Sequence, residues 1–209
     1  MYIPPAFALT TDDARAFIEA RGFGLLVTQS EQGFDTAPLP LMLVGNTLIG
    51  HVAKANPAWK REGRAMVLFS GADGYISPSW YPTKAETGKV VPTWNYELVQ
   101  VQATLSAEHD VEAKRQIVCA LTDRHEKAVN STWSVSDAPG EYIDALLNAI
   151  VGITLTIKSI EGKAKLSQNQ PEANQASVRV AVSDTPLARA MNPQSAELRA
   201  HPRAAPTTG

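Results

Sequence analysis

Three short segments of the sequence combine residue types that can bind a charged or aromatic ligand. The first runs from Gly50 to Lys60 and contains His51, Lys54, Asn56 and Trp59. Asn56 followed by proline is typical of a helix start, where free backbone N–H groups attract anions, and Lys54 supplies positive charge. The segment therefore indicates a phosphate site. A helix cap, a packed indole and solvated lysines explain the same pattern, so both interpretations stay open.

The second segment is split between residues 75–81 and 91–96, which are rich in aromatic and hydroxyl side chains. Its candidate ligand contacts are Ser77, Trp80, Thr93, Trp94 and Asn95. Aromatic side chains beside hydroxyls suit a planar heteroaromatic ligand with polar edges, such as a flavin or a base. The alternative is a packed aromatic girdle at one end of a barrel.

The third segment covers residues 162–169 and includes Lys165 and Gln168. In an extended chain Lys163, Lys165 and Ser167 share one face, so two ammonium groups and a hydroxyl could hold a phosphate or a carboxylate. A charged edge strand that discourages aggregation is the competing interpretation.

Other common site chemistries find little support in the sequence. The four histidines are scattered and no two have metal-ligand spacing, so no metal site is expected. Cys119 lies in an apolar helical pattern and is interpreted as a small buried hydrophobe. No glycine-rich phosphate loop of either common spacing is present.

Composition places the chain among ordinary globular proteins. It has 209 residues, of which 44% are hydrophobic and 19% charged, with a net charge of -2. This composition excludes a disordered protein. The single cysteine excludes a disulfide within the chain, and no apolar run is long enough to span a membrane. The N-terminus lacks the features of a secretory signal, so we expect a cytoplasmic protein. Residues 163–209 carry six basic against three acidic residues, which is too sparse to predict DNA binding.

Hydrophobic periodicity predicts strands first, then helices, then a returning strand. A capped helix begins near Thr10 and ends at Gly22. Strands are predicted over 25–28, 36–44, 47–53, 65–70 and 90–105, with turns at 32–33, 45–46 and 71–74. A helical turn follows Asn56, and residues 82–89 are predicted to be a mobile loop. Helices over 110–124 and 137–150 precede a strand over 153–157 that continues through 163–166, and a last helix starts near residues 185–186.

Two prolines mark one strand edge. Pro38 and Pro40 are two residues apart, so their missing N–H groups lie along the same edge, which must face solvent, a bulge or a ligand. The element order predicts a mainly β fold with helices, namely a small antiparallel β-barrel with helices packed outside and at one end. We expect a single domain over residues 1–190, with a helical C-terminal part, and a flexible tail over 191–209.

Four blocks of sequence resemble the PaiB-like family, which is described as FMN-binding negative transcriptional regulators. The blocks are residues 51–57 (HVAKANP), 75–81 (YISPSWY), 91–96 (VPTWNY) and 165–169 (KLSQN). The resemblance covers residues 1 to about 190. It implies an FMN-binding split β-barrel of the flavin-reductase type, usually a homodimer, with FMN near the subunit interface and the flavin ring along strand backbone. DNA is implied as a partner only by the family's description as transcriptional regulators. The alternative function is a flavin-dependent oxidoreductase or a haem-handling protein of the same fold.

Carried over by position, the resemblance implies that Lys54 and Asn56 hold the phosphate while His51 stands beside the flavin. Ser77, Trp80 and residues 93–96 would line the rest of the site. The sequence departs from the family pattern in two places that bear on function. The family usually has arginine at position 54; lysine keeps the positive charge but cannot donate the two parallel hydrogen bonds that a guanidinium gives a phosphate. Gln100 stands where the family usually shows a histidine, so proton transfer or haem contact by that side chain is lost.

Overall fold

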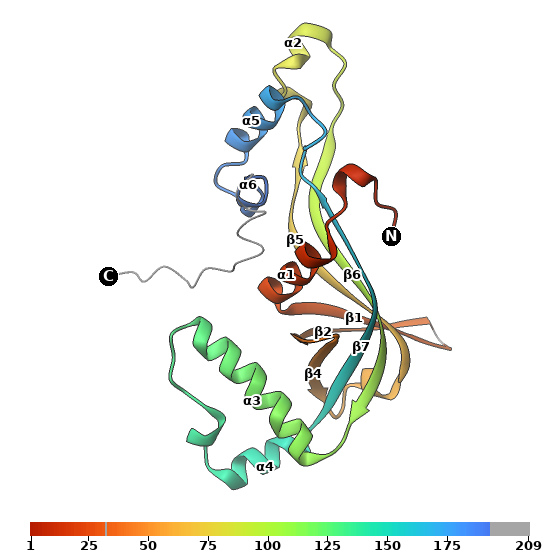
Figure 1. The fold of residues 1–209 in the computed structure, drawn as a ribbon, viewed down its shortest axis with the longest axis vertical. Coiled ribbons are helices and arrows are strands. Elements are labelled where there is room, and N and C mark those ends of the chain that lie inside the picture. The colour runs from red at the N-terminus through yellow and green to blue at the C-terminus, as the bar shows by residue number, and fades with distance from the viewer. Residues whose placement is uncertain (32, 193–209) are drawn as a thin grey trace. The chain divides into compact units, whose positions relative to one another are not determined.

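The computed structural model describes residues 1–31 and 33–192, and Figure 1 shows their arrangement. Within these residues seven strands form one sheet in the order β2-β1-β5-β6-β7-β4-β3. The strands are β1 (Phe23–Ser30), β2 (Gly33–Pro40), β3 (Met42–Val44), β4 (Thr47–Ala53), β5 (Gly63–Ile76), β6 (Thr93–Glu108) and β7 (Ile150–Lys165). The helices are α1 (Thr11–Arg21), α2 (Thr83–Thr87), α3 (Val111–Ala128), α4 (Gly140–Asn148), α5 (Glu172–Ala181) and α6 (Pro186–Ala190). The predicted class, mainly β with helices, is confirmed.

The chain divides into two compact units. The first contains Met1–Ala20, Ser70–Gln100 and Glu161–Pro202, described as far as residue 192, and the second contains Arg21–Phe69 and Val101–Ile160. Strands β5, β6 and β7 contribute residues to both units. The single domain expected over residues 1–190 stays a prediction. The flexible tail expected over 191–209 lies outside the described residues from 193 onward, and its first residue, Met191, is 6% exposed.

The second unit is built on antiparallel pairs of strands. Strand β1 pairs with β2 along its whole length and with β5 over residues 25–28, while β4 pairs with β7. Its core consists of side chains that are at most 1% exposed, including Leu26, Leu48, Val67, Phe69, Val101, Leu105, Ile153 and Leu155. Helices α3 and α4 are neighbours at one end of this unit (Figure 1). Along β1, β4, β5 and β6 these buried residues alternate mainly with half-buried ones, which is the period-two pattern read from the sequence.

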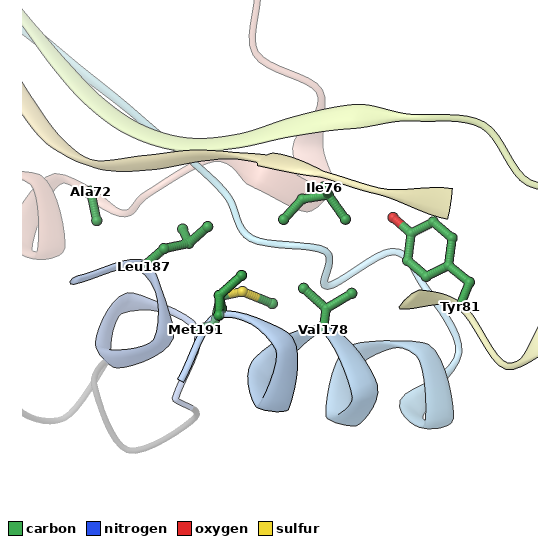
Figure 2. Close-up of a cluster of buried hydrophobic side chains, with 7 residues drawn as sticks. Ala72, Ile76, Tyr81, Val178, Leu187 and Met191 are labelled. Carbon is green, nitrogen blue, oxygen red and sulfur yellow. The ribbon is translucent and has the colours of Figure 1, made fainter. Parts of the chain in front are cut away.

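The first unit has its own apolar cluster, shown in Figure 2. Helices α5 and α6 pack against β5 through Ala72, Ile76, Tyr81, Val178, Val182, Leu187 and Met191, all at most 7% exposed. Helix α5 is absent from the sequence predictions. Its buried Asn174 is satisfied by hydrogen bonds with Thr83 and Gln170, so a polar residue occupies a position where a helical pattern would have an apolar one.

The proline-marked strand lies at an end of the sheet order, as predicted. Pro38 and Pro40 are exposed, and the alternating Ala37 and Leu39 are buried. The predicted strand over 36–44 is divided at Leu41, whose N–H donates to the Gly22 carbonyl at 2.7 Å. The chain thereby leaves β2 and begins β3.

Two further predictions about local structure are wrong. Residues 71–74 do not turn, because β5 continues without a break to Ile76. Gly71 is needed there for close packing: a Cβ atom at this position would lie 2.6 Å from the Glu97 Cβ. Residues 82–89 contain the short helix α2, which ends at Gly88 with φ of 65°, a conformation that glycine adopts readily. The turn expected at 32–33 includes residue 32, which lies outside the described residues.

Candidate functional site

The first candidate segment forms a tight turn after β4 in the second unit. The Lys54 N–H donates to the Ala149 carbonyl at 2.8 Å, and the Asn56 N–H donates to the Ala53 carbonyl at 2.8 Å. The 3₁₀ turn η2 (Pro57–Lys60) follows, and the Asn56 Oδ1 accepts the Ala58 N–H at 2.9 Å. The predicted helical turn with Asn56 as its cap is therefore confirmed. Because the Ala58 N–H donates to the Asn56 side chain, it is not available to an anion.

Trp59 braces this turn. Its Nε1–H donates to the Lys54 carbonyl at 3.0 Å. The His109 ring meets the indole edge-on at a centroid distance of 5.2 Å, and the Lys60 Nζ lies 5.3 Å from the indole centroid. These contacts fix the carbonyl of Lys54 and the start of η2 as one unit.

The electrostatics of the turn favour an anion at Lys54. The Lys54 side chain is exposed and has no carboxylate partner among residues 1–31 and 33–192. His51 is half-buried on β4, opposite Gly152 of β7. Burial lowers the pKa of His51 below its ordinary value, so the ring is neutral at neutral pH and can offer a hydrogen bond but no charge. The turn can thus hold a phosphate through one ammonium group.

A second group of predicted residues meets in the first unit, where β6 begins and β7 ends. The Lys165 Nζ donates to the Thr93 Oγ1 and, at 2.8 Å, to the Trp94 carbonyl. Burial lowers the pKa of Lys165, and nearby Lys163 lowers it further, while Tyr96 raises it. The Lys163 Nζ lies 5.2 Å from the centroid of the Tyr96 ring. The lysines predicted to share a face are both held against the start of β6.

The KLSQN block forms a hydrogen-bonded turn. Asn95 is fully buried, and its Nδ2 donates to the Ser167 Oγ at 2.9 Å. Ser167 has φ of 66°, the left-handed region that a serine seldom adopts. The Gln168 amide accepts the Leu166 N–H at 2.6 Å and donates to the Ala164 carbonyl. The side chains of Asn95 and Gln168 thus form hydrogen bonds within the chain, and these bonds hold this end of β7 in place.

The remaining aromatic candidates differ in exposure. Ser77 caps η3 (Pro78–Trp80) by accepting the Ser79 N–H at 3.2 Å, and half-buried Trp80 packs against the cluster of Figure 2. Trp94 is 50% exposed; its Nε1–H donates to the Asp73 Oδ2 at 3.0 Å, and the ring of Tyr75 lies 6.2 Å away. Of the predicted tryptophans, Trp94 therefore offers the most open indole face.

The structure thus divides the predicted residues between the two units. His51, Lys54, Asn56 and Trp59 gather in the second unit, and Ser77, Trp80, Thr93, Trp94, Asn95, Lys165 and Gln168 belong to the first. Sequence reasoning missed His109 and Asp73, which orient Trp59 and Trp94. Asp73 was placed in a turn, and His109 is 50 residues from Trp59, so no local pattern connected either with its indole.

Comparison with known proteins supplies the family. The family model FMN_bind_2, described as "Putative FMN-binding domain", matches residues 1–159. The protease synthase and sporulation protein PAI 2 of Bacillus subtilis is 31% identical over 183 residues, which cover 83% of this chain and 85% of that protein. The chain belongs to the PaiB-like FMN-binding family. This membership supports a flavin as the cofactor, and Lys165 and Gln168 lie beyond the part matched by the family model.

Other relatives are more distant or only partly covered. An uncharacterized protein of Emericella nidulans is 32% identical over 161 residues, or 63% of this chain, and a second from Aspergillus fumigatus is 34% identical over 60% of it. The matches span 64% and 62% of the length of these fungal proteins.

Solved structures share the fold of this PaiB-like chain. The conserved hypothetical protein Rv2991 of Mycobacterium tuberculosis aligns with a TM-score of 0.59 at 12% identity, over 82% of this chain and 95% of that one. The FAD and heme binding protein of Mycobacterium smegmatis aligns with a TM-score of 0.54 at 17% identity, over 75% and 71%. The predicted split β-barrel is the fold of this chain. Among the described residues, no helix combines the length and apolar character needed to cross a bilayer.

Proposed function

We propose that this chain binds FMN and that the turn from Lys54 to Trp59 receives its phosphate. The observation that carries the proposal is the exposed Lys54 ammonium, which has no carboxylate partner in the described part of the chain and stands on a turn fixed by the Trp59 indole. An exposed cation on a rigid loop suits a phosphate, because little conformational freedom is lost when the anion binds. When bound, FMN supplies reversible electron and hydride transfer at its ring.

The other predicted residues enter the proposal with roles that their contacts suggest. Neutral His51 would contact the cofactor by hydrogen bonding, and Asn56 would preserve the shape of the turn. Considered by itself, the first unit offers a ligand the exposed aromatic face of Trp94, and its Lys165 ammonium is hydrogen-bonded to Thr93 and to the Trp94 carbonyl. Ser77, Trp80, Thr93, Asn95 and Gln168 would position these groups.

Binding of three flavins tests the choice of FMN. Protein freed of any flavin is titrated into FMN, FAD or riboflavin, and quenching of flavin fluorescence gives each Kd. We expect FMN to bind most tightly, because riboflavin lacks the phosphate and FAD adds a bulky nucleotide to it. Equal affinity for FMN and riboflavin would show that no phosphate contact contributes to binding.

We extend the proposal to a cytoplasmic homodimer with a PaiB-type regulatory role, which rests on the family resemblance and the similarity to PAI 2. The alternative is a flavin-dependent oxidoreductase or a haem-handling protein of the same fold, a fold shared by the FAD and heme binding protein of Mycobacterium smegmatis. Gln100, on β6 with its Nε2 3.5 Å from the Glu161 Oε2, weakens that alternative, since an amide cannot relay protons as an imidazole does.

Three measurements separate these roles. Light scattering at several concentrations gives the number of chains in the assembly. A gel-shift series with promoter DNA at increasing salt tests regulation, and absence of a shift at low salt would reject direct DNA binding. Anaerobic addition of NADH or NADPH tests the alternative, because a reductase would bleach the bound flavin.

A further inference from the structure

A groove in the second unit shares only Lys60 with the segment predicted to hold the phosphate and is lined by none of the other residues predicted to hold the cofactor. Its polar part, about 650 Å³, lies between the end of β1 and the connection from η2 to β5, where Lys60, Arg61 and Arg64 line it. A smaller part of about 240 Å³ is lined by apolar side chains, among them Val27, Phe34 and Met66. Gln29 and Arg64 line both parts, so the two volumes adjoin.

Strand register explains why the groove is polar at one end and apolar at the other. Val27 of β1 lies opposite Met66 of β5, and Gln29 lies opposite Phe34 of β2. Residues two apart on a strand share a face, so Gln29 follows Val27 and Arg64 precedes Met66 on that face. A strip of sheet surface therefore changes from apolar (Val27 and Met66) to polar (Gln29 and Arg64) within one step along two neighbouring strands, and Phe34 of β2 lies beside Gln29.

The charges at the polar end leave cations available. The Arg61 Nε is paired with the Asp35 Oδ2 at 3.0 Å. Glu62 also lines the groove, but its Oε1 accepts the Ala107 N–H at 2.7 Å. Lys60 and Arg64 have no carboxylate partner within residues 1–31 and 33–192, and the remaining acidic residue of the lining, Glu31, is exposed to solvent. The polar end thus carries both signs of charge, and Lys60 and Arg64 are the two cations there that an anion can contact.

We propose that this groove binds an organic carboxylate whose anionic group adjoins a flat apolar group. The planar guanidinium of Arg64 can donate two parallel hydrogen bonds to a carboxylate, and Lys60 adds a second positive charge. The apolar group lies on Val27, Met66 and Phe34, of which Phe34 is 76% exposed and gains most from being covered. Such a ligand satisfies both ends of the groove, whereas a small inorganic anion satisfies only one.

Calorimetric titration with 1-naphthoate tests the site, using the full chain both saturated with FMN and free of it. We expect one saturable site per chain in both forms, and an affinity that falls with added salt. Arg64→Gln should weaken binding by at least about tenfold, the loss of a charge-assisted contact. Phe34→Ser should weaken it severalfold through the apolar part. Acetate and 1-naphthalenemethanol, which each carry one half of the probe, should bind more weakly than 1-naphthoate.

The controls keep the proposal falsifiable. Lys158→Gln removes an exposed charge of the same unit outside the groove and should leave the affinity for 1-naphthoate unchanged. Absence of saturable binding would overturn the proposal, and so would wild-type affinity in both Arg64→Gln and Phe34→Ser. Binding to the FMN-free form alone would assign the groove to the cofactor and overturn a separate site. FMN affinity is measured on the same samples, so a failure here is distinguishable from failure of the proposed function.

Discussion

Replacing Lys54 with alanine should weaken FMN binding while leaving riboflavin binding unchanged. The side chain is exposed, and the hydrogen bonds of the residue-54 backbone with Ala149 and Trp59 remain available in Lys54→Ala. Only the charge-assisted contact with the phosphate is removed. A contact of this kind at an exposed position contributes about 1–2 kcal/mol, which corresponds to a Kd about five- to thirtyfold higher.

The assay is quenching of flavin fluorescence at low ionic strength, where screening is weakest. FMN and riboflavin are titrated with the wild type, Lys54→Ala, Lys54→Arg and, as a matched control on the same unit, Lys158→Ala. Lys54→Arg should bind FMN at least as tightly as the wild type, since the guanidinium can form two hydrogen bonds with a phosphate. Added salt should weaken FMN binding more in the wild type than in Lys54→Ala.

Two results would refute the placement of the phosphate. One is an FMN affinity of Lys54→Ala equal to that of the wild type. The other is an equal loss for FMN and riboflavin, which would mean that Lys54 acts on the shape of the site and not on the phosphate. Thermal unfolding of each variant shows that the fold is intact before affinities are compared.

Three further predictions concern stability. Burial lowers the pKa of His51, so the unfolded chain binds a proton at this ring more readily than the folded chain does. The free energy of unfolding should therefore fall as the pH drops below the ordinary histidine pKa of 6.5. His51→Gln should reduce that loss, as measured by thermal melts between pH 7.5 and 5. Gly71→Ala should lower the free energy of unfolding in urea by about 1–3 kcal/mol, because the new Cβ would clash with the Glu97 side chain. Lys114→Met should lower the free energy of unfolding in urea by about 1–3 kcal/mol. The buried Lys114 Nζ donates to the Leu147 carbonyl at 2.7 Å, and methionine leaves that carbonyl without this donor.

Each of these predictions has a matched control. His125→Gln, which removes a histidine at an exposed position of α3, is the control for His51→Gln. Apart from its neighbours in the chain and in helix α4, no atom of the described residues lies within 4 Å of a Cβ built at Gly140, so Gly140→Ala should be neutral or slightly stabilising. Lys127 is exposed on the last turn of α3, so Lys127→Met should change the free energy of unfolding little. A variant that behaves like its control contradicts the corresponding reasoning.

The sequence alone determined the elements whose signals are local. The Thr10 cap and Gly22 define α1, because the Thr10 Oγ1 accepts the Asp13 N–H and Gly22 adopts φ of 61°. Two prolines place β2 at a sheet edge, and Asn56 followed by Pro57 starts η2. In each case the backbone geometry follows from side chains within a few residues, so the chain needs no distant partner to specify it.

Only the tertiary structure decided the features that depend on distant residues. Gly71 belongs to a strand, not a turn, because Glu97 and Phe17 approach it closely. Trp59 is oriented by His109, and Ser167 adopts its left-handed conformation while bonded to Asn95, 72 residues away in sequence. A short pattern such as glycine–alanine–aspartate–glycine (71–74) or serine–glutamine (167–168) is compatible with several backbone conformations, and packing against residues remote in sequence selects one of them.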